Sequence, residues 1–328
     1  MKTKYFEAMR NFKNKKVAVI GDIMLDRREF GIISKKENPE DKNVPIILAR
    51  EEFYLGGASN VAKNIVSLGA KCDLYGIYGS DIYGNKIEEL CKENEINNFC
   101  EKTNLDTIVK SRIFIDEKYS HRSDFGELSL KKINPEIQEK IIYSLDKNPH
   151  YDAVIISDYN KSLFTSDFSQ EIIKLFNKKC VPIFVDPKPQ NIECFKNSKI
   201  ICPNAKEAEK ITGIKYLHDL KTLEKMGENL SKKINSDEII ITCSENGSYV
   251  YNRGVSKIIP TKAEKVVDVT GAGDSFISAL SLAFVSGLNV YDSAKLANVA
   301  AGIVVEKKGT ATASIEEIIG KIDKEEVL

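Results

Sequence analysis

The stretch that most constrains this fold reads DVTGAGD at residues 268–274 and continues as SFISAL at residues 275–280. Its small residues stand directly before an apolar, helix-forming run. A glycine-rich turn at a helix N-terminus directs several backbone N–H groups at one point, and the helix dipole adds partial positive charge there. We therefore expect the backbone of Gly271, Ala272 and Gly273 to form an anion hole suited to phosphate and to its transition-state charge.

Asp274 closes the same turn. A carboxylate beside an anion hole is a poor ligand for phosphate but a good acceptor of protons. Its predicted role is to take the proton from a hydroxyl group that attacks a phosphoryl group. The structural alternative is an N-cap aspartate, with glycines that serve close packing.

Short apolar runs separated by helical patterns fill much of the remaining chain. The predicted buried strands are residues 16–22, 72–79, 152–158, 181–186, 199–204 and 238–244. The predicted amphipathic helices are residues 58–69, 136–147, 169–179 and 223–234. Strands that are apolar on both faces and alternate with helices predict an α/β fold, in which a mostly parallel sheet has helices on both sides.

Residues 29–50 and 105–130 break that alternation with short β-prone runs. We expect them to form antiparallel strands of a small accessory sheet. The chain has no Pro/Gly/Ser-rich linker and no internal repeat. The prediction is therefore a single domain over residues 1–328 with a small sheet-like lid.

The composition excludes several classes of protein. Lysine plus arginine equal aspartate plus glutamate at 48 each, which argues against a nucleic-acid partner because such proteins usually carry a basic excess. No apolar run approaches the ~20 residues that span a bilayer, and residues 1–16 lack the apolar core of a signal peptide. We therefore expect no membrane association and a cytoplasmic protein. The 7 cysteines form no CxxC pair, so we expect reduced, mostly buried thiols.

Two common nucleotide-binding signatures are absent. The segment 79–84 begins and ends with glycine but is followed by Asn85 instead of lysine, so it is not a Walker A loop. Gly21 is followed by Asp22 and Met24, which breaks the GxGxxG pattern. The sequence predicts neither a P-loop enzyme nor a nicotinamide-dependent one.

A second glycine-rich turn reads LGGASN at residues 55–60. Gly57 lets a ligand approach the backbone closely. Asn60 falls in the first turn of the following helix and offers both a donor and an acceptor to sugar hydroxyls. The alternative is an ordinary turn before a polar helix start.

Together, these two turns resemble the two-part signature of the ribokinase family, also called the PfkB carbohydrate kinases. The segment NAKE at residues 204–207 is similar to the family's Asn-x-x-Glu motif. The segment TCSENG at residues 242–247 resembles its Thr-x-Gly-x-x-Gly loop, with Ser244 in place of a glycine. The resemblance spans nearly the whole chain. It implies a doubly wound sheet with a β lid and ATP-dependent phosphorylation of a sugar hydroxyl.

On that resemblance, Asp274 is the catalytic base, and Asp26, Gly57 and Asn60 contact the sugar. The residues implied on the ATP side are Lys188, Asn204, Thr242, Ser244, Gly247 and Asn298. A packed helix position is the alternative for Asn298.

The resemblance also implies cation sites. Asn204 and Glu207 are implied to act on Mg²⁺ through water, because Mg²⁺ keeps several waters. An ordinary polar helix start is the alternative for that pair. Asp268 and neighbouring carbonyls are implied as the K⁺ site that some relatives have.

Further segments are similar to the subfamily that phosphorylates heptose 7-phosphate to heptose 1,7-bisphosphate in ADP-heptose biosynthesis. These segments are GDIMLDR (21–27), RSD (122–124), SDYNK (157–161), VDPK (185–188) and the lid residues 38–40 and 44–46. The chain departs from that pattern at Asn160, where a glycine is usual, and in a lid that is one or two residues longer. The substrate therefore stays open among heptose 7-phosphate and other sugars such as fructose, ribose or 2-keto-3-deoxygluconate. A non-catalytic sugar or nucleotide sensor is the remaining alternative.

A phosphorylated sugar needs cationic hydrogen-bond donors. The basic residues in or near the predicted lid are Arg27, Lys35, Lys36, Arg112 and Arg122. Asp124 is expected either to bind sugar hydroxyls or to orient Arg122. A solvated charged face is the alternative for each of these basic residues.

The expected partners are a small-molecule sugar phosphate and ATP. A homodimer is a further possibility, since family members often dimerise, sometimes through the lid strands. In many relatives the kinase is fused to a nucleotidyltransferase domain with a His-x-x-His motif. The 3 histidines, His121, His150 and His218, are not so spaced, so we expect no such domain in this chain.

Overall fold

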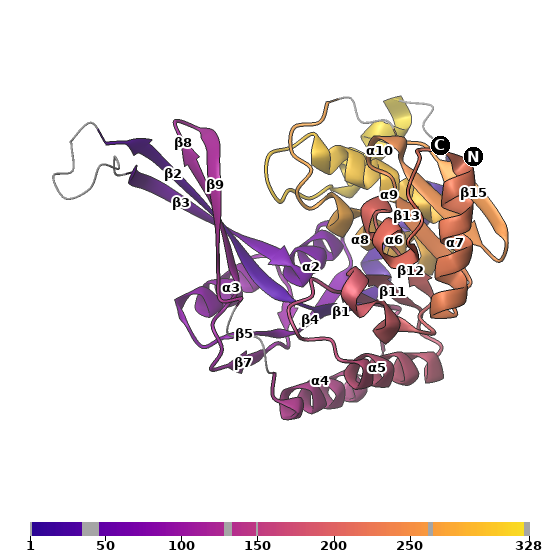
Figure 1. The fold of residues 1–328 in the computed structure, drawn as a ribbon, viewed down its shortest axis with the longest axis horizontal. Helices are drawn as coiled ribbons and strands as arrows, with labels where there is room; N and C mark the ends of the chain where they lie inside the picture. The colour runs from indigo at the N-terminus through magenta and orange to yellow at the C-terminus, as the bar shows by residue number, and fades with distance from the viewer. Residues whose placement is uncertain (1, 35–45, 128–132, 149, 262–264, 325–328) are drawn as a thin grey trace.

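The computed structural model describes residues 2–34, 46–127, 133–148, 150–261 and 265–324 (Figure 1). Within them, a 9-stranded sheet forms the centre of the molecule. Its strands, in spatial order, are β15 (Val255–Ile259), β14 (Ser248–Asn252), β13 (Glu238–Thr242), β12 (Ile200–Ile201), β11 (Ile183–Asp186), β10 (Ala153–Ser157), β1 (Lys16–Gly21), β4 (Lys71–Tyr75) and β6 (Asn97–Asn98). The pairs from β13 to β6 are parallel, and β14 and β15 add an antiparallel edge. The predicted mostly parallel sheet is confirmed.

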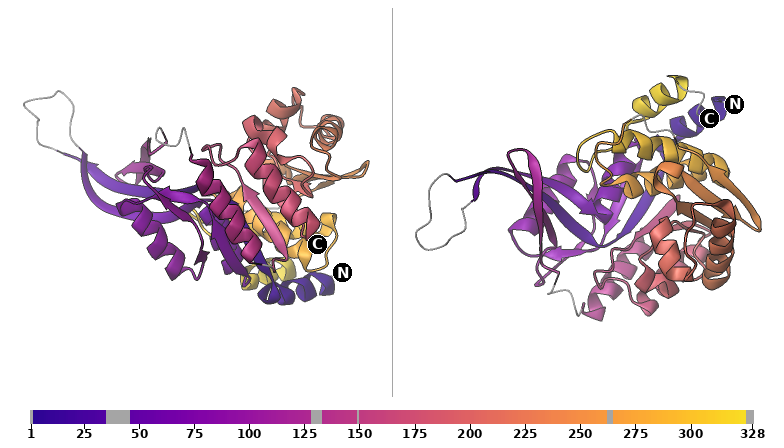
Figure 2. Two further views of the ribbon diagram at one scale, coloured as in Figure 1. Left: turned by 90° about the horizontal axis from the view of Figure 1, so that it is seen from below. Right: turned by 45° about the horizontal axis from the view of Figure 1, so that its top comes forward.

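A smaller sheet, here called the lid sheet, projects from one side of the main body (Figures 1 and 2). Its strands, in spatial order, are β3 (Ile46–Gly57), β2 (Ile23–Ile33), β8 (Val109–Ile115) and β9 (Lys118–Phe125). Both outer pairs are antiparallel, as expected, whereas the inner pair of β2 and β8 is parallel. The inner strands run parallel because each enters the lid sheet from the main body and returns through its own partner strand. A separate two-stranded sheet joins β5 (Ile77–Gly79) to β7 (Glu101–Thr103).

Helices cover both faces of the main sheet. They are α1 (Thr3–Asn11), α2 (Ala58–Ser67), α3 (Ile82–Glu93), α4 (Pro135–Lys147), α5 (Ser166–Lys178), α6 (Ala205–Thr212), α7 (Leu220–Ile234), α8 (Ala272–Val285), α9 (Val290–Val305) and α10 (Ile315–Lys324). Short 3₁₀ helices cover Phe12–Asn14, Pro189–Phe195 and Ser244–Asn246.

The strand alternation divides the core between those two layers. Val17 and Val19 of β1 pack with apolar residues of α2, α8 and α9. Ala18 and Ile20 of the same strand pack with α4, α5 and α7. Successive side chains of a strand point to opposite faces, so a strand covered on both sides must be apolar throughout. This requirement explains the continuous apolar runs in the sequence.

The carboxyl ends of the parallel strands meet at one edge of the sheet. Ser157 ends β10, Asp186 ends β11, and Thr242 ends β13. Open α/β sheets bind ligands at this edge, because the loops that leave the strands converge there. The fold therefore predicts a site between these strand ends and the N-terminus of α8.

Some expected features lie outside the described residues. They are Lys35, Lys36, the lid residues 38–40, Val44 and Pro45, and the end of the 105–130 segment. All 7 cysteines are described and free, and 4 of them are buried. In the described part of the chain, no helix has the length and apolarity to cross a membrane.

Candidate active site

The glycine turn at residues 270–273 forms as expected, with Gly271 as the N-cap of α8 at φ 81°. A side chain there is disfavoured by this left-handed backbone, and a Cβ atom would lie 3.0 Å from Nδ2 of Asn60. Gly271 and Gly273 line the pocket described below. Ala272 does not line it, and its N–H donates to the carbonyl of Val269 at 3.3 Å. The turn itself therefore uses the N–H group of Ala272, which was expected to be one of the donors of the anion hole.

Asp274 lies in the first turn of α8 and is 5% exposed. Its carboxylate does not cap the helix. Asn60 Nδ2 donates to its Oδ2 at 2.6 Å, and the Tyr159 hydroxyl donates to its Oδ1 at 2.9 Å. The N-cap alternative is wrong, since both carboxylate oxygens face side chains from other elements.

Burial is the main influence on the acidity of Asp274, raising the pKa of its carboxyl group to about 6. The negative charge of Asp26 adds to this rise, whereas the hydrogen bonds from Asn60 and Tyr159 and the charge of Lys110 oppose it. A carboxylate with this pKa is ionised at neutral pH but still basic enough to accept a proton efficiently. These properties are those of a general base.

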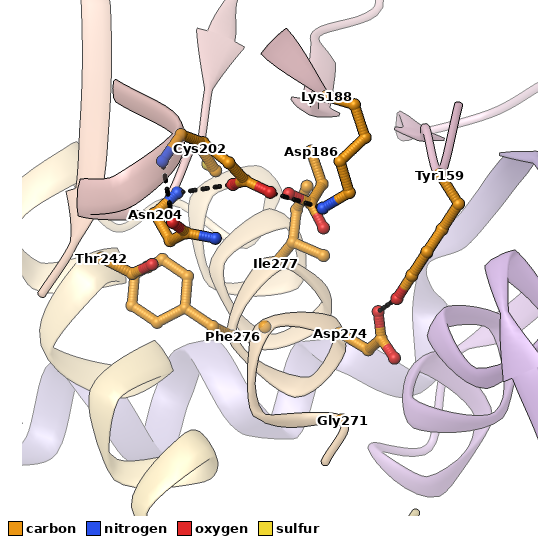
Figure 3. A pocket seen from close by; sticks show the side chains of 12 residues that line it. Tyr159, Asp186, Lys188, Cys202, Asn204, Thr242, Gly271, Asp274, Phe276 and Ile277 are labelled. Carbon is orange, nitrogen blue, oxygen red and sulfur yellow. Dashed lines mark hydrogen bonds and ion pairs between the residues drawn. The ribbon is translucent and has the colours of Figure 1, made fainter. Parts of the chain in front are cut away.

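A pocket of about 160 Å³ opens beside Asp274 (Figure 3). Its lining residues are Tyr159, Asp186, Lys188, Cys202, Asn204, Glu207, Thr242, Gly271, Gly273, Asp274, Phe276 and Ile277. These residues come from the ends of β11, β12 and β13, the loops after β10, β11 and β12, and the starts of α6 and α8. The structure thus brings together five of the residues expected to contact ATP or magnesium or to accept the proton: Lys188, Asn204, Glu207, Thr242 and Asp274.

Asn204 and Glu207 form a reciprocal capping box at the start of α6. Glu207 Oε2 accepts from the Asn204 backbone N–H at 2.9 Å, and Oε1 lies 2.5 Å from Lys188 Nζ. The pair therefore forms the ordinary polar helix start that was the alternative to a magnesium site. The same arrangement also places the carboxylate of Glu207 at the pocket wall. Nearby Asp186 has its pKa raised well above the ordinary value by burial, with the charges of Glu207 and Asp274 adding to the rise.

Ser244 and Gly247 do not line the pocket. They form a tight turn after β13, in which Ser244 has φ 52° and Gly247 has φ 80°. Asn160, the other departure from the family pattern, has φ 56°. A left-handed backbone explains why glycine would suit positions 160 and 244, since glycine adopts this conformation without strain. Asparagine tolerates a left-handed backbone better than most other residues do.

Asn298 is buried in α9 outside the pocket, and its Nδ2 donates to the carbonyl of Ile259 at 2.9 Å. It thus holds the end of β15, as a packed helix position would. Asp268 accepts from the backbone N–H groups of Thr270 and Gly309 and from the guanidinium group of Arg28. The carboxylate expected at a K⁺ site is therefore already engaged with a cation from the lid sheet.

Several of the residues expected to contact the sugar lie on the lid sheet. Asp26 is buried, and its Oδ1 accepts from Arg112 at 2.6 Å. Gly57 ends β3 with φ 57° and contacts the carbonyl of Asp22 too closely for any side chain. Arg122 forms a forked pair with Asp124, so Asp124 orients the arginine.

Arg27 was expected among the basic residues that could hold a substrate phosphate, but strand alternation places it on the face of β2 opposite to Asp26. There it pairs with Glu51 at 2.8 Å and with Glu29 at 3.0 Å. Arg28 takes the position on the same face as Asp26. The register across β2, β8 and β9 then aligns Arg28 with Arg112 and Arg112 with Arg122, a group here called the arginine row.

The sequence reasoning missed Arg28, Tyr159, Asp186 and Lys110 as site residues. The signal for Arg28 was available, because β2 begins at Ile23 and its alternation puts residues 26 and 28 on one face. Tyr159 and Asp186 stand at or just after the ends of parallel strands, where ligand-binding residues gather. Lys110 is paired with Asp26 only by the register of two distant strands.

Comparison with known proteins gives the relationships of the whole chain. Residues 14–318 match the model of the pfkB family carbohydrate kinases. The chain is 37% identical over 306 residues to bifunctional protein HldE of a Nitratiruptor species, covering 92% of this chain and 64% of that protein. It is 35% identical over 309 residues to bifunctional protein HldE of Aliarcobacter butzleri, covering 93% and 64%. The chain thus spans less than two thirds of these relatives.

Solved structures show the same fold at low sequence identity. Phosphofructokinase-2 from Escherichia coli, in complex with substrates and products, superposes with a TM-score of 0.76 at 15% identity, covering 93% of this chain and 97% of that one. Arabidopsis thaliana ribokinase, complexed with ribose and ATP, gives 0.73 at 18% identity with the same coverage. The ribokinase-like fold is therefore confirmed. Because the family model matches residues 14–318, which are nearly the whole chain, this chain belongs to the pfkB family of carbohydrate kinases.

Proposed function

We propose that this chain transfers the γ-phosphoryl group of ATP to the anomeric hydroxyl of heptose 7-phosphate, in the route to ADP-heptose. The observation that carries the proposal is the place of Asp274, a buried carboxylate that lines the pocket and also lies within the influence of Asp26 and Lys110 of the lid sheet. The segments similar to heptose kinases and the relatives named HldE support this choice of sugar.

Asp274 acts as the general base in this proposal. The hydroxyl oxygen attacks the γ-phosphorus, its proton passes to the Asp274 carboxylate, and the bond between the γ-phosphorus and the bridging oxygen breaks to release ADP. Gly271 and Gly273 line the pocket at the start of α8. The positive end of this helix dipole would face the transferred group.

Asn60 and Asp26 are the proposed contacts for sugar hydroxyls. Asn60 is 0% exposed, and its Oδ1 has no hydrogen-bond partner within the described residues. A buried acceptor without a partner costs free energy, which a donating hydroxyl group would recover. Asp26 keeps a second carboxylate oxygen beside Gly56, where a Cβ atom would lie 2.8 Å away. That glycine leaves the carboxylate room to turn toward a sugar.

The arginine row is the proposed holder of the sugar's 7-phosphate. Arg28, Arg112 and Arg122 lie on adjacent strands and on the same face as Asp26. Guanidinium groups bind phosphate through two parallel hydrogen bonds, which fixes the orientation of the substrate as well as its affinity. Each of these arginines also pairs with a carboxylate, namely Asp268, Asp26 or Asp124, so a bound phosphate would share the guanidinium groups with those partners.

The residues at the pocket fit a bound Mg–ATP. The described residues contain no cluster of three or more His, Cys, Asp or Glu side chains able to hold a metal ion by themselves. Mg²⁺ is commonly held by one or two carboxylates together with waters and substrate phosphates, which matches the pocket-lining carboxylate of Glu207 and the amide of Asn204. The ion would neutralise phosphate charge when bound. Lys188, held by Glu207, would contact the phosphates directly.

K⁺ dependence and dimerisation are finer proposals. A K⁺ ion at Asp268 would share the carboxylate with Arg28, so turnover in K⁺ and Na⁺ buffers tests that site.

A homodimer through the lid sheet is supported by exposed apolar side chains at its far end, namely Ile32, Ile33, Ile47 and Leu48. Sedimentation of the free protein tests the dimer.

The extent and location of the enzyme are also proposed. The pfkB family carbohydrate kinase model matches residues 14–318, so we infer one kinase domain over that part of the chain. Free thiols and the use of ATP support a cytoplasmic location.

A coupled ADP-release assay with Mg–ATP tests the proposed function. The panel contains heptose 7-phosphate, sedoheptulose 7-phosphate, fructose 6-phosphate, ribose, fructose and 2-keto-3-deoxygluconate. Turnover confined to heptose 7-phosphate supports the proposal. Turnover on an uncharged sugar keeps the kinase and removes the heptose assignment, whereas silence across the panel favours a sensor.

A further inference from the structure

The hydroxyl group of Tyr159 lies against the carboxylate of Asp274 (Figure 3). Tyr159 donates to Oδ1 at 2.9 Å, while Asn60 donates to Oδ2 at 2.6 Å from the other side. A carboxylate held at both oxygens cannot rotate freely about its χ2 angle. The two donors therefore fix the plane of the group that must meet the sugar hydroxyl.

The loop that carries Tyr159 is itself tightly held. Asp22, which is 2% exposed, accepts from the backbone N–H groups of Tyr159 at 2.7 Å and Lys161 at 3.1 Å. Asp158 accepts from the N–H of Asn160 at 2.8 Å and from that of Lys188 at 2.9 Å. Two buried carboxylates thus fix the backbone of the short loop after β10 that carries Tyr159.

The ring of Tyr159 lies between the two halves of the site. Lys110 Nζ of the lid sheet is 4.9 Å from the ring centre, and Lys188 Nζ on the ATP side is 5.3 Å from it. Burial, followed by the charge of Asp274, raises the pKa of the phenol well above its ordinary value. The phenol therefore keeps its proton at neutral pH and acts toward Asp274 only as a donor.

We propose that Tyr159 is a positioning residue for phosphoryl transfer, which orients the Asp274 carboxylate and stabilises its ionised form. This inference rests on the proposed role of Asp274 as the base. Hydrogen bonds to a carboxylate favour its charged state, so the phenol offsets part of the effect of burial. The base is thereby held ionised and aimed before the sugar arrives.

Other charged groups also face this carboxylate. Asp26 of β2 raises the pKa of Asp274 and Lys110 of β8 lowers it, while Asp186 of β11 and Lys188 lie across the pocket. None of these is removed by a change of Tyr159 to phenylalanine. A shift in the titration of Asp274 on that substitution can therefore be assigned to the lost hydroxyl group.

The test compares Tyr159→Phe with the wild type in two measurements. In the first, kcat and KM for the accepted sugar are measured from pH 5 to pH 9. We expect the acid limb to move up by about one pH unit and KM for ATP to change less than about twofold. We expect kcat near pH 7 to fall about tenfold, of which the smaller ionised fraction accounts for about twofold and the lost alignment of the carboxylate for the rest. In the second, NMR titration of ¹³C-labelled aspartate carboxyls, assigned with Asp274→Asn, reads the pKa of Asp274 without turnover.

Tyr5→Phe is the matched control. Tyr5 is 1% exposed and donates to Asp292 Oδ1 at 2.8 Å, far from the pocket. This variant loses the same kind of hydrogen bond and should keep the wild-type pH profile. A Tyr159→Phe protein with an unmoved acid limb and an unmoved carboxyl titration overturns the inference, even if it is less stable. A wild type without sugar-dependent ADP release defeats the proposed function instead, and the NMR titration still decides the role of Tyr159.

Discussion

Arg28 of lid strand β2 donates to Asp268 Oδ2 across a distance of 3.1 Å. Asp268 also accepts from the N–H of Thr270 at 3.0 Å, and so stabilises the turn that leads to Asp274. The guanidinium group lies 5.4 Å from the ring of Phe114 and 5.9 Å from that of Tyr54, both in the lid sheet. One side chain therefore links the lid sheet to the turn that leads to Asp274.

Arg28→Ala should weaken sugar binding more than ATP binding. The variant loses a member of the arginine row and the link to Asp268, so we expect KM for the sugar to rise about tenfold and KM for ATP to stay nearly constant. Steady-state kinetics with each substrate varied in turn measure both. Arg50→Ala, a change at a 55% exposed arginine side chain on the lid sheet, is the control. A rise confined to KM for ATP would contradict this assignment.

Asp274→Asn should lower kcat by a factor of about 10² to 10⁴, because the amide cannot accept the hydroxyl proton. Stability should not fall with it. Burial disfavours the charged form of this carboxyl, so its neutral replacement removes a cost at neutral pH. Thermal unfolding checks this second expectation. Near-normal turnover in the variant would remove Asp274 from its role as base.

The pH dependence of kcat/KM should show an acid limb near pH 6. The pKa of Asp274 is raised to about 6, first by burial and then by the charge of Asp26. The base works in its ionised form, so the rate falls about tenfold for each pH unit below that value. Because this pKa lies above that of the unfolded chain, the ionised carboxyl destabilises the fold above pH 6 and does not below pH 4. A rate that stays flat down to pH 5 would contradict the pKa.

Arg122→Ala should raise KM for a phosphorylated sugar by about 10- to 100-fold, the effect of losing hydrogen bonds to a charged group. Arg27→Ala is the matched control, because Arg27 lies on the opposite face of β2 and pairs with Glu51. We expect it to change KM less than about threefold. Equal effects from both variants would show that the arginine row does not hold the sugar's phosphate.

Gly271→Ala should reduce both stability and turnover. The position has φ 81°, and the added Cβ would lie 3.0 Å from Nδ2 of Asn60. The left-handed backbone alone costs about 1–2 kcal/mol with alanine, and a shift of Asn60 would disturb the carboxylate of Asp274. Gly273→Ala, where a Cβ meets nothing within 4 Å, is the control for stability. Chemical denaturation of the two variants measures the difference.

Most of the main sheet could be predicted from local patterns. The strand at residues 16–22 and the helix at 58–69 match β1 and α2 closely, because a strand buried on both faces and an amphipathic helix each leave a periodic record. The segment 72–79 was expected as one strand but forms β4 and β5, which split at Gly76. A Cβ at Gly76 would lie 2.4 Å from the carbonyl of Gly21, a contact between distant segments that no local pattern contains.

The lid sheet was harder to predict. Its strands were expected at residues 29–50 and 105–130, whereas β2 already begins at Ile23 and β3 extends to Gly57. The apolar run at the start of β2 belongs to the core, so it resembles a continuation of the first strand. Starting β2 too late also hid its alternation, which is why Arg27 was selected and Arg28 was overlooked.

By itself, the sequence determined the α/β architecture, the glycine turn before α8, and the position of Asp274 within that turn. These features depend on periodicity and on backbone preferences over a few residues. Only the tertiary structure decided what surrounds the carboxylate. Asn60 and Tyr159 are 214 and 115 residues from Asp274 along the chain. They meet it because the spatial order of the strands brings separate loops to one edge of the sheet, and that order is set by packing of the whole core.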